Sequence, residues 1–256
     1  MHNEQLAELL NRTLVIVAHP DDEAIGAGAL LRRMREAAVV FCTDGGPRDP
    51  YFWNKYGSRE HYAQVRRREA DAAMRMAGVR RTDILPITDQ HLYQNLPLAF
   101  EELDRVTRDF QPDAILTLAY EGGHPDHDSC AFLSSVLGER RQLPVWEMAL
   151  YHRNKDGPPC QDFLHPEWSG VPLEMTTQEL EAKKRMVKLY ISQGEALQNF
   201  VFSYECFRRQ PDYDFRKPPA AEVINYEAWQ WTMKATEVAS AFAAFLDARN
   251  RVGERH

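Results

Sequence analysis

Two short stretches of the chain carry histidine and carboxylate side chains at spacings that suit a metal site. The first, HPDDE at residues 19–23, follows an apolar run directly, and the second, HPDH at residues 124–127, follows another apolar run and a short glycine turn. Three nitrogen or oxygen ligands with one open position are typical of catalytic zinc sites. Neither stretch contains cysteine, so a Lewis-acid site open to solvent fits better than a structural thiolate site.

Each stretch on its own also has a purely structural interpretation. Proline at the first position of a helix, followed by acids in the first turn, is ordinary for a helix start. The pair favours chemistry, because both histidines precede proline, where the backbone is extended, while the acids that follow lie on a helical turn. Together the stretches supply the imidazoles of His19, His124 and His127 and several carboxylates.

The elements that must position these stretches have the pattern of an open parallel sheet. Short apolar runs, typical of strands covered on both faces, alternate with helical patterns, and this order predicts right-handed βαβ crossovers. We therefore predict an α/β fold with a Rossmann-like, mostly parallel sheet, helices on both faces and a helical C-terminal extension. Both stretches would then lie at the carboxyl edge of the sheet, where ligands bind. The expected strands are 14–18, 38–43, 84–88, 114–119 and 146–151, and the expected helices are 24–35, 59–77, 97–110, one that a capping box opens at Thr176, and a last one near 226–249.

Length and composition fit a single domain. The chain has 256 residues, of which 44% are hydrophobic and 27% charged, and it shows no internal repeat and no long linker. We expect one domain over residues 1–256, with a core at about 12–200 and the extension at about 200–256.

Charge and targeting signals exclude several classes of protein. Lys and Arg number 31 and Asp and Glu 38, so the net charge of −7 argues against a nucleic-acid binder. No apolar run approaches the ~20 residues needed for a membrane span. No signal-peptide pattern is visible and the four cysteines lack CxxC spacing, so we expect a cytoplasmic protein with reduced thiols.

The two stretches resemble the paired motifs of the LmbE/PIG-L family of zinc-dependent N-deacetylases. The resemblance covers roughly residues 12–200 on this motif context. Weaker matches support it: the TDG turn at 43–45, the Arg66 and Glu69 pair, the Gly78-Val79 helix end, Asp89, and Ser192-Gln193.

The resemblance implies one Zn²⁺ per chain, held by His19, Asp22 and His127, and Fe²⁺ would fit the same ligands. It implies that zinc-bound water attacks an amide, with Asp21 as the general base. His124 would stabilise the oxyanion or protonate the leaving amine. The substrate would be a GlcNAc-like amino-sugar conjugate that loses an N-acetyl or another short N-acyl group.

Substrate binding and oxyanion assistance follow the family less closely. The resemblance implies that Arg66 and Asp89 contact sugar hydroxyls. Some relatives place a tyrosine two residues before the second motif's first histidine, but here that position is Gly122, with Tyr120 and Glu121 nearby. Whether either of these two side chains replaces that tyrosine is left open.

Two other functions remain as alternatives: a metal- or sugar-binding protein without turnover, and a metal-dependent phosphoesterase. Asp21 argues against a pure binder, because a binding site needs no free base. A phosphoesterase normally uses two metals ~3.5–4 Å apart. The oligomeric state is also open, with a homo-oligomer as one alternative.

A few further residues have a structural and a functional interpretation. Gly26 and Gly28 lack the third glycine of a dinucleotide fingerprint, so we expect them to allow close helix–sheet packing. The aromatic cluster at 51–56 suits either sugar stacking or a satellite core, and Trp229 and Trp231 are interpreted as packing residues. His152 and His165 either reach the pocket or lie at the surface.

Overall fold

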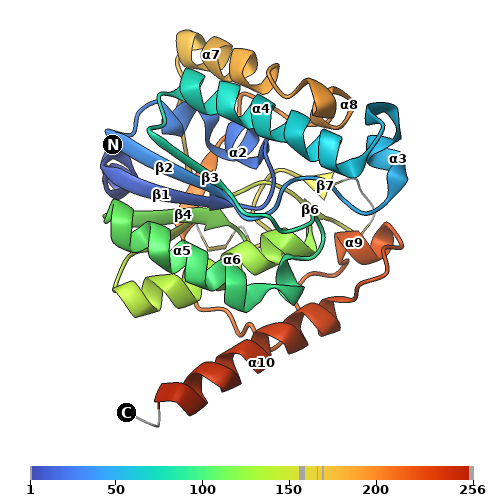
Figure 1. Ribbon diagram of the computed structural model, residues 1–256. Helices are drawn as coiled ribbons and strands as arrows, with labels where there is room; N and C mark the ends of the chain where they lie inside the picture. The colour runs from blue at the N-terminus through green and yellow to red at the C-terminus, as the bar shows by residue number, and fades with distance from the viewer. Residues whose placement is uncertain (1, 156–158, 166, 169, 254–256) are drawn as a thin grey trace.

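A seven-stranded sheet lies at the centre of the computed structural model, which describes residues 2–155, 159–165, 167–168 and 170–253 (Figure 1). The strand order is β3-β2-β1-β4-β5-β9-β8. Strands β1 to β5 are parallel, whereas β9 is antiparallel to both of its neighbours. The strands are β1 (Arg12–Val17), β2 (Glu36–Phe41), β3 (Arg81–Ile84), β4 (Ala114–Leu118), β5 (Val145–Met148), β8 (Val171–Pro172) and β9 (Cys206–Arg209), and β6 (His152–Arg153) pairs with β7 (Pro159–Cys160) in a separate ribbon.

Helices cover both faces of the sheet, as predicted. Figure 1 shows α2, α4 and α7 on one face and α5, α6 and α10 on the other. The central strands are therefore continuous apolar runs, and Val15 of β1 lies in register between Val39 of β2 and Leu116 of β4, all three fully buried. The longer helices are α2 (Asp22–Leu31), α4 (Arg59–Ala77), α5 (Leu96–Phe110), α6 (Pro125–Arg141), α7 (Thr177–Val187) and α10 (Ala235–Gly253). The short ones are α1 (His2–Gln5), α3 (Pro50–Trp53), α8 (Gly194–Leu197), α9 (Asn225–Ala228) and the 3-10 turns η1 (Ala7–Leu10), η2 (Asn54–Tyr56), η3 (Leu92–Gln94) and η4 (Ile191–Gln193).

Several local predictions are confirmed. Helix α4 has the predicted bounds and ends at Gly78, whose φ of +82° is the left-handed value that glycine adopts without strain. The capping box that opens α7 forms between Thr176 and Glu179. A side chain at Gly26 would meet Met148 Sδ at 2.6 Å, so this glycine does allow α2 to approach the sheet closely.

Two predicted strands are displaced. The third strand is Arg81–Ile84 instead of 84–88. It lies at the edge of the sheet and is half-buried, so its sequence is not an apolar run, and the apolar residues Leu85 and Ile87 are buried in the loop that follows it. The fifth strand ends at Met148 instead of continuing to Tyr151.

The C-terminal part departs from a purely helical extension. Its aromatic stretch near 200–215 contains β9, which adds a strand to the sheet. The last helix begins at Ala235 instead of near 226. The carboxylate of Glu227 accepts the backbone N–H of Ala235 at 2.9 Å, and this contact fixes the start of the helix after a loop.

Two findings concern other expectations of the sequence. Cys42, Cys130 and Cys206 are free thiols in buried positions. Among the described helices, none is both long and apolar enough to cross a membrane.

Candidate metal and catalytic site

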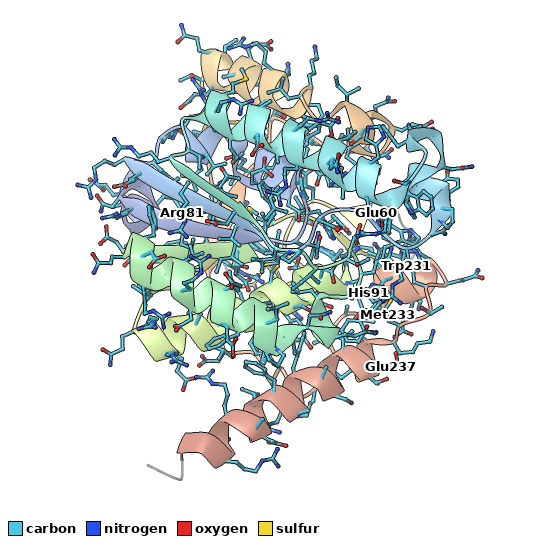
Figure 2. All side chains as sticks on the ribbon, in the orientation of Figure 1. Glu60, Arg81, His91, Trp231, Met233 and Glu237 are labelled. Atoms are coloured by element: carbon cyan, nitrogen blue, oxygen red, sulfur yellow. The ribbon has the colours of Figure 1, made fainter. Side chains whose placement is uncertain are left out.

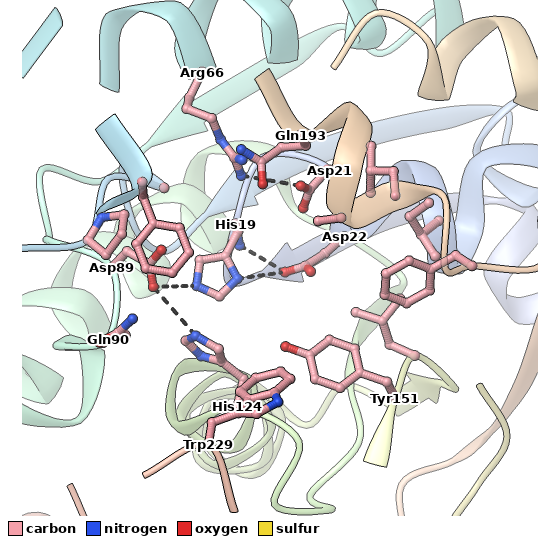
Figure 3. A pocket seen from close by; sticks show the side chains of 18 of the residues that line it. His19, Asp21, Asp22, Arg66, Asp89, Gln90, His124, Tyr151, Gln193 and Trp229 are labelled. Carbon is pink, nitrogen blue, oxygen red and sulfur yellow. Dashed lines mark hydrogen bonds and ion pairs between the residues drawn. The ribbon is translucent and has the colours of Figure 1, made fainter. Parts of the chain in front are cut away.

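The two histidine stretches meet at the carboxyl edge of the sheet. His19 follows β1, and His124 and His127 stand at the start of α6, which follows β4. The ring of His19 lies 4.4 Å from that of His124 and 5.4 Å from that of His127, measured between centroids. Segments that are 105 positions apart thus place three buried imidazoles around one point, as the sequence predicts, and Figure 3 shows two of them, those of His19 and His124.

Asp22 lies between two of these rings. Its Oδ1 is 3.3 Å from Nε2 of His127, and its Oδ2 is 3.5 Å from Nδ1 of His19. The same Oδ2 accepts the backbone N–H groups of Ala18 and His19, which fixes the carboxylate against the end of β1. Burial alone would raise the pKa of Asp22, but the two imidazoles outweigh it and hold this pKa well below its usual range.

Two further carboxylates face the histidines. Asp89 Oδ1 lies 3.1 Å from Nε2 of His19 and 3.5 Å from Nε2 of His124. Asp126 Oδ2 lies 3.3 Å from Nε2 of His19 and also accepts the N–H of Gln90 at 2.6 Å, which ties the loop after β3 to α6. Asp89 therefore lies among the candidate metal ligands. The sequence predicts a contact with sugar hydroxyls for this residue, but not its proximity to the histidines.

The donor set fits a divalent metal ion. One ligand atom from each of His19, His124 and His127 lies within 4.8 Å of the others. A second, overlapping group meets the same distance limit and consists of His19, Asp89, His124 and Asp126. Nε2 of His127 and Oδ1 of Asp89 are buried and have no hydrogen-bond partner among the described residues. A mixed nitrogen and oxygen site of this kind suits Zn²⁺ or Fe²⁺.

His124 also has a defined hydrogen-bonding role. Its side chain caps α6, because Nδ1 accepts the backbone N–H of Asp126 at 3.1 Å. Burial and the neighbouring His19 lower the pKa of His124 well below its usual value, so the ring is neutral. A neutral ring that accepts through Nδ1 carries its hydrogen on Nε2, and this N–H faces the cluster.

Asp21 has an unusual backbone. Its φ of +134° lies in the region that favours glycine, and such strain persists only where the surroundings enforce it. Glu23 supplies part of that support, since its Oε2 accepts the N–H of Asp21 at 3.1 Å while its Oε1 lies 2.6 Å from the hydroxyl of Tyr190. Burial raises the pKa of Asp21 to about 7, against the opposing effect of Arg66.

Arg66 reaches the site from α4. It is almost fully buried, donates to the carbonyl oxygen of Pro20 at 2.6 Å and lies 3.3 Å from Oδ2 of Asp21. The guanidinium thus fixes the turn that carries the first motif and also lines the cavity.

A cavity of about 640 Å³ opens above the cluster. Of the predicted residues it is lined by His19, Asp21, Asp22, Arg66, Asp89 and His124, whereas His127 lies beneath. Further lining side chains come from late in the chain and were missed as site residues: Tyr151, Gln193, Phe200, Trp229 and Trp231. Trp231 does pack against a buried cluster, as the sequence predicts, but both Trp229 and Trp231 also line the cavity.

Tyr151 supplies a tyrosine hydroxyl to the site, although the position at which some relatives carry a tyrosine is Gly122 here. Its ring lies 4.9 Å from that of His127, and Figure 3 shows its hydroxyl pointing into the cavity. A side chain at Gly123 would collide with the carbonyl oxygen of Tyr151, so this glycine permits the close approach. Burial raises the pKa of Tyr151 well above its usual value, so the hydroxyl keeps its proton.

Neither Tyr120 nor Glu121, the two side chains that precede Gly122, reaches the position that Tyr151 occupies. The hydroxyl of Tyr120 donates to the carbonyl oxygen of Lys217, and the carboxyl of Glu121 accepts the N–H of Leu164. His152 lies 3.1 Å from Asp162 and, like His165, is not among the residues that line the cavity.

Comparison with protein families agrees with the geometry. Residues 14–136 match the sequence model of the PIG-L family, described as GlcNAc-PI de-N-acetylase. By this match we call the segment the PIG-L domain. It contains every residue that the sequence assigned to the site, whereas Tyr151, Gln193 and the two cavity tryptophans lie beyond its end.

Two curated relatives illustrate the sequence similarity of the PIG-L domain. The probable N-acetyl-alpha-D-glucosaminyl L-malate deacetylase 2 of Bacillus cereus is 27% identical over 145 residues, which are 54% of this chain and 65% of that protein. The mycothiol S-conjugate amidase of Streptomyces coelicolor is 33% identical over 141 residues, 45% of this chain and 47% of that protein. The chain thus matches between about half and two thirds of the length of these relatives.

Solved structures share the fold. A deacetylase of teicoplanin biosynthesis has a TM-score of 0.63 at 17% identity, over 79% of this chain and 100% of that one. The 4-carboxy-2-hydroxymuconate hydratase of Pseudomonas putida KT2440 has a TM-score of 0.54 at 18% identity, over 79% of this chain and 98% of that one. Because identities this low support the fold alone, the chemistry must be argued from the residues.

Proposed function

We propose that the protein is a metal-dependent amide hydrolase that removes an N-acetyl or another short N-acyl group from a GlcNAc-like amino-sugar conjugate. The observation that carries the proposal is the position of Asp22 between the rings of His19 and His127, with Asp21 beside it on a strained backbone. The names of two curated relatives, a GlcNAc-malate deacetylase and a mycothiol conjugate amidase, support an amide bond and an amino sugar as the substrate.

His19, Asp22 and His127 would hold the metal, since the carboxylate of Asp22 lies within 3.5 Å of a ring nitrogen of each of the two histidines. When bound, Zn²⁺ would supply a Lewis acid that polarises the amide carbonyl and makes water acidic near neutral pH. Asp126 holds the loop after β3 and the ring of His19 in place, through its hydrogen bonds to the N–H of Gln90 and to Nε2 of His19.

Asp21 is the proposed general base. Its carboxylate faces the cavity, beside the metal ligand Asp22 but paired with Arg66. Because Asp21 is not itself assigned to the metal, its carboxylate is free to take the proton of the attacking water. The strained backbone and its support by Glu23 fix the direction of that carboxylate.

His124 and Tyr151 are the proposed hydrogen-bond donors to the oxyanion. The Nε2–H of His124 and the hydroxyl of Tyr151 both face the space above the histidine cluster. Donors fixed in advance at the place where negative charge develops lower the barrier most effectively. The proton that Asp21 has accepted passes to the amide nitrogen as the carbon–nitrogen bond breaks, so that a carboxylate and a free amine leave.

The two alternatives receive less support. A binder without turnover has no need for a carboxylate in a strained conformation beside the ligand set. A two-metal phosphoesterase would need a second ligand cluster, and the two candidate groups in the described part of the chain share His19 and His124. Arg66 and Asp89 stay predicted contacts of the sugar, since both line the cavity.

The test is release of acetate from a panel of N-acetylglucosamine conjugates by zinc-loaded protein. We expect turnover that chelation abolishes and Zn²⁺ restores. Release of inorganic phosphate from phosphate esters, without release of acetate from any conjugate, would instead support the phosphoesterase.

A further inference from the structure

Aromatic side chains line the outer part of the cavity, and two of them, Trp229 and Trp231, lie beyond the PIG-L domain in sequence. We propose that this outer part is a subsite for an uncharged aromatic or alkyl aglycone attached to the amino sugar, a proposal that rests on the proposed function. The subsite is formed by Trp229 and Trp231 on one side of the cavity and by Tyr51 and Phe52 of α3 on another.

The tryptophan side forms a continuous aromatic wall that starts at the histidines. The ring of Trp231 lies 5.1 Å from that of His124, edge to face, and 5.1 Å from that of Trp229. Tyr151 continues the wall at 6.3 Å from Trp229. Trp229 is 40% exposed, so the wall leads from the reacting centre out to solvent.

Two rings of α3 also border the cavity. The rings of Tyr51 and Phe52 lie 5.3 Å apart, and they are 83% and 39% exposed. Neighbouring exposed aromatic side chains are typical of binding surfaces, since a ligand that covers them removes apolar area from water. A volume of about 640 Å³ is in the range of sites that take drug-sized ligands.

Charge decides which aglycone fits. The described lining residues include three acids, Asp21, Asp22 and Asp89, one guanidinium, that of Arg66, and the imidazoles of His19 and His124. Arg66 is already engaged by Asp21 and by the carbonyl oxygen of Pro20. Figure 3 shows Arg66 and Trp229 on opposite sides of His19, so this guanidinium is not placed to pair with a phosphate or carboxylate held against Trp229, and an uncharged group is favoured there.

The wall is anchored to the catalytic turn. Asn225, fully buried, donates its backbone N–H to the carbonyl oxygen of Gly122 at 2.8 Å and its side-chain amide to that of Gly123 at 3.0 Å. Trp231 also packs against the buried cluster of Tyr226, Met233 and Ala235, and Figure 2 shows it on the segment that leads into α10. The tryptophan side of the subsite is thus fixed in position relative to His124 before any ligand binds.

The test compares three glycosides of N-acetyl-α-D-glucosamine: phenyl, 4-carboxyphenyl and methyl. Dissociation constants are measured by calorimetry on zinc-loaded Asp21→Asn protein, and acetate release is measured on the zinc-loaded enzyme. The variants are Trp229→Ala, Trp229→Phe and, as a matched control, Trp168→Ala. Trp168 is also 40% exposed but does not line the cavity.

We expect the phenyl glycoside to bind about five- to tenfold more tightly than the methyl glycoside, as one added aromatic contact allows. The carboxyphenyl glycoside should lose that advantage. Trp229→Ala should abolish it, whereas Trp229→Phe and Trp168→Ala should retain it.

Equal affinity for the phenyl and methyl glycosides, a preference for the carboxyphenyl glycoside, or an advantage that survives in Trp229→Ala would overturn the subsite. If acetate is nevertheless released, the proposed function stands without it. A phenyl advantage that depends on Trp229 but comes with no acetate release would support the subsite and contradict the proposed hydrolysis.

Discussion

The backbone N–H of Asp21 donates to the carboxyl group of Glu23 at 3.1 Å, and through this contact the fifth residue of the HPDDE motif holds the third. Asp21 has a φ of +134°, which an aspartate adopts only under constraint. The hydroxyl of Tyr190 holds the other oxygen of Glu23 at 2.6 Å. The direction of the proposed base therefore depends on a tyrosine 169 positions away in the chain.

Loss of the Tyr190 hydroxyl should lower turnover without removing metal. We expect Tyr190→Phe to reduce kcat roughly tenfold, with KM and metal content unchanged, because Asp21 would lose part of its orientation. The measurement is steady-state acetate release together with metal analysis. Tyr120→Phe is the matched control, since that hydroxyl bonds to the carbonyl of Lys217, outside the site. Equal losses in both variants would contradict a positioning role.

The fold and the centre of the site could be predicted because their signals are local. Apolar runs followed by HPDDE and HPDH place two turns at the same sheet edge, and a parallel sheet leaves no other arrangement for them. Asp89 could be associated with the site by its place after the third strand, but not with the histidines specifically. Its contact with His19 depends on how the loop after β3 is tied to Asp126.

The cavity walls could not be predicted, because they depend on long-range contacts. Tyr151 reaches the site only because Gly123 lets the carbonyl of Tyr151 approach. Trp229 and Trp231 are positioned by the bonds of Asn225 to the turn before His124, and nothing in a pair of tryptophans near a helix distinguishes a cavity wall from a core contact. The antiparallel strand β9 was missed for a similar reason: its pairing with β5 is a tertiary property.

Metal binding should stabilise the folded chain. Zn²⁺ at about 100 times its Kd should add about 2.7 kcal/mol, and a chain of this size should gain about 5–10 °C in Tm. The check is thermal unfolding of chelator-treated protein with and without Zn²⁺. His127→Ala should abolish the increase, while His165→Ala, a histidine that does not line the cavity, should retain it. An equal increase in both variants would mean that the ion binds elsewhere.

Stability should fall as the pH rises because of a buried carboxyl group that is not among the proposed metal ligands, that of Glu121. Burial raises the pKa of Glu121 from 4.5 to about 8, although Leu164 donates a hydrogen bond to it. Between these two values the folded chain keeps a proton that the unfolded chain releases, so a rise in pH favours unfolding. Glu121→Gln, which keeps the acceptor oxygen, should remove a loss on the order of 4 kcal/mol between pH 5 and pH 8.

Urea denaturation at both pH values measures this loss. Glu167→Gln is the control, because Glu167 is exposed and lies near Leu164 in the chain, whose N–H donates to Glu121. The assignment to Glu121 is wrong if Glu121→Gln shows the same fall in unfolding free energy as the wild type.

Metal content and turnover of Asp21→Asn and Asp22→Asn, measured side by side, test the central claim most directly. The two residues are adjacent in sequence, but the account gives one to the proton and the other to the metal. It predicts that Asp21→Asn keeps about one metal ion per chain and loses at least ~100-fold in kcat, whereas Asp22→Asn loses the ion. Equal loss of metal in both variants, or full metal content in Asp22→Asn, would contradict it.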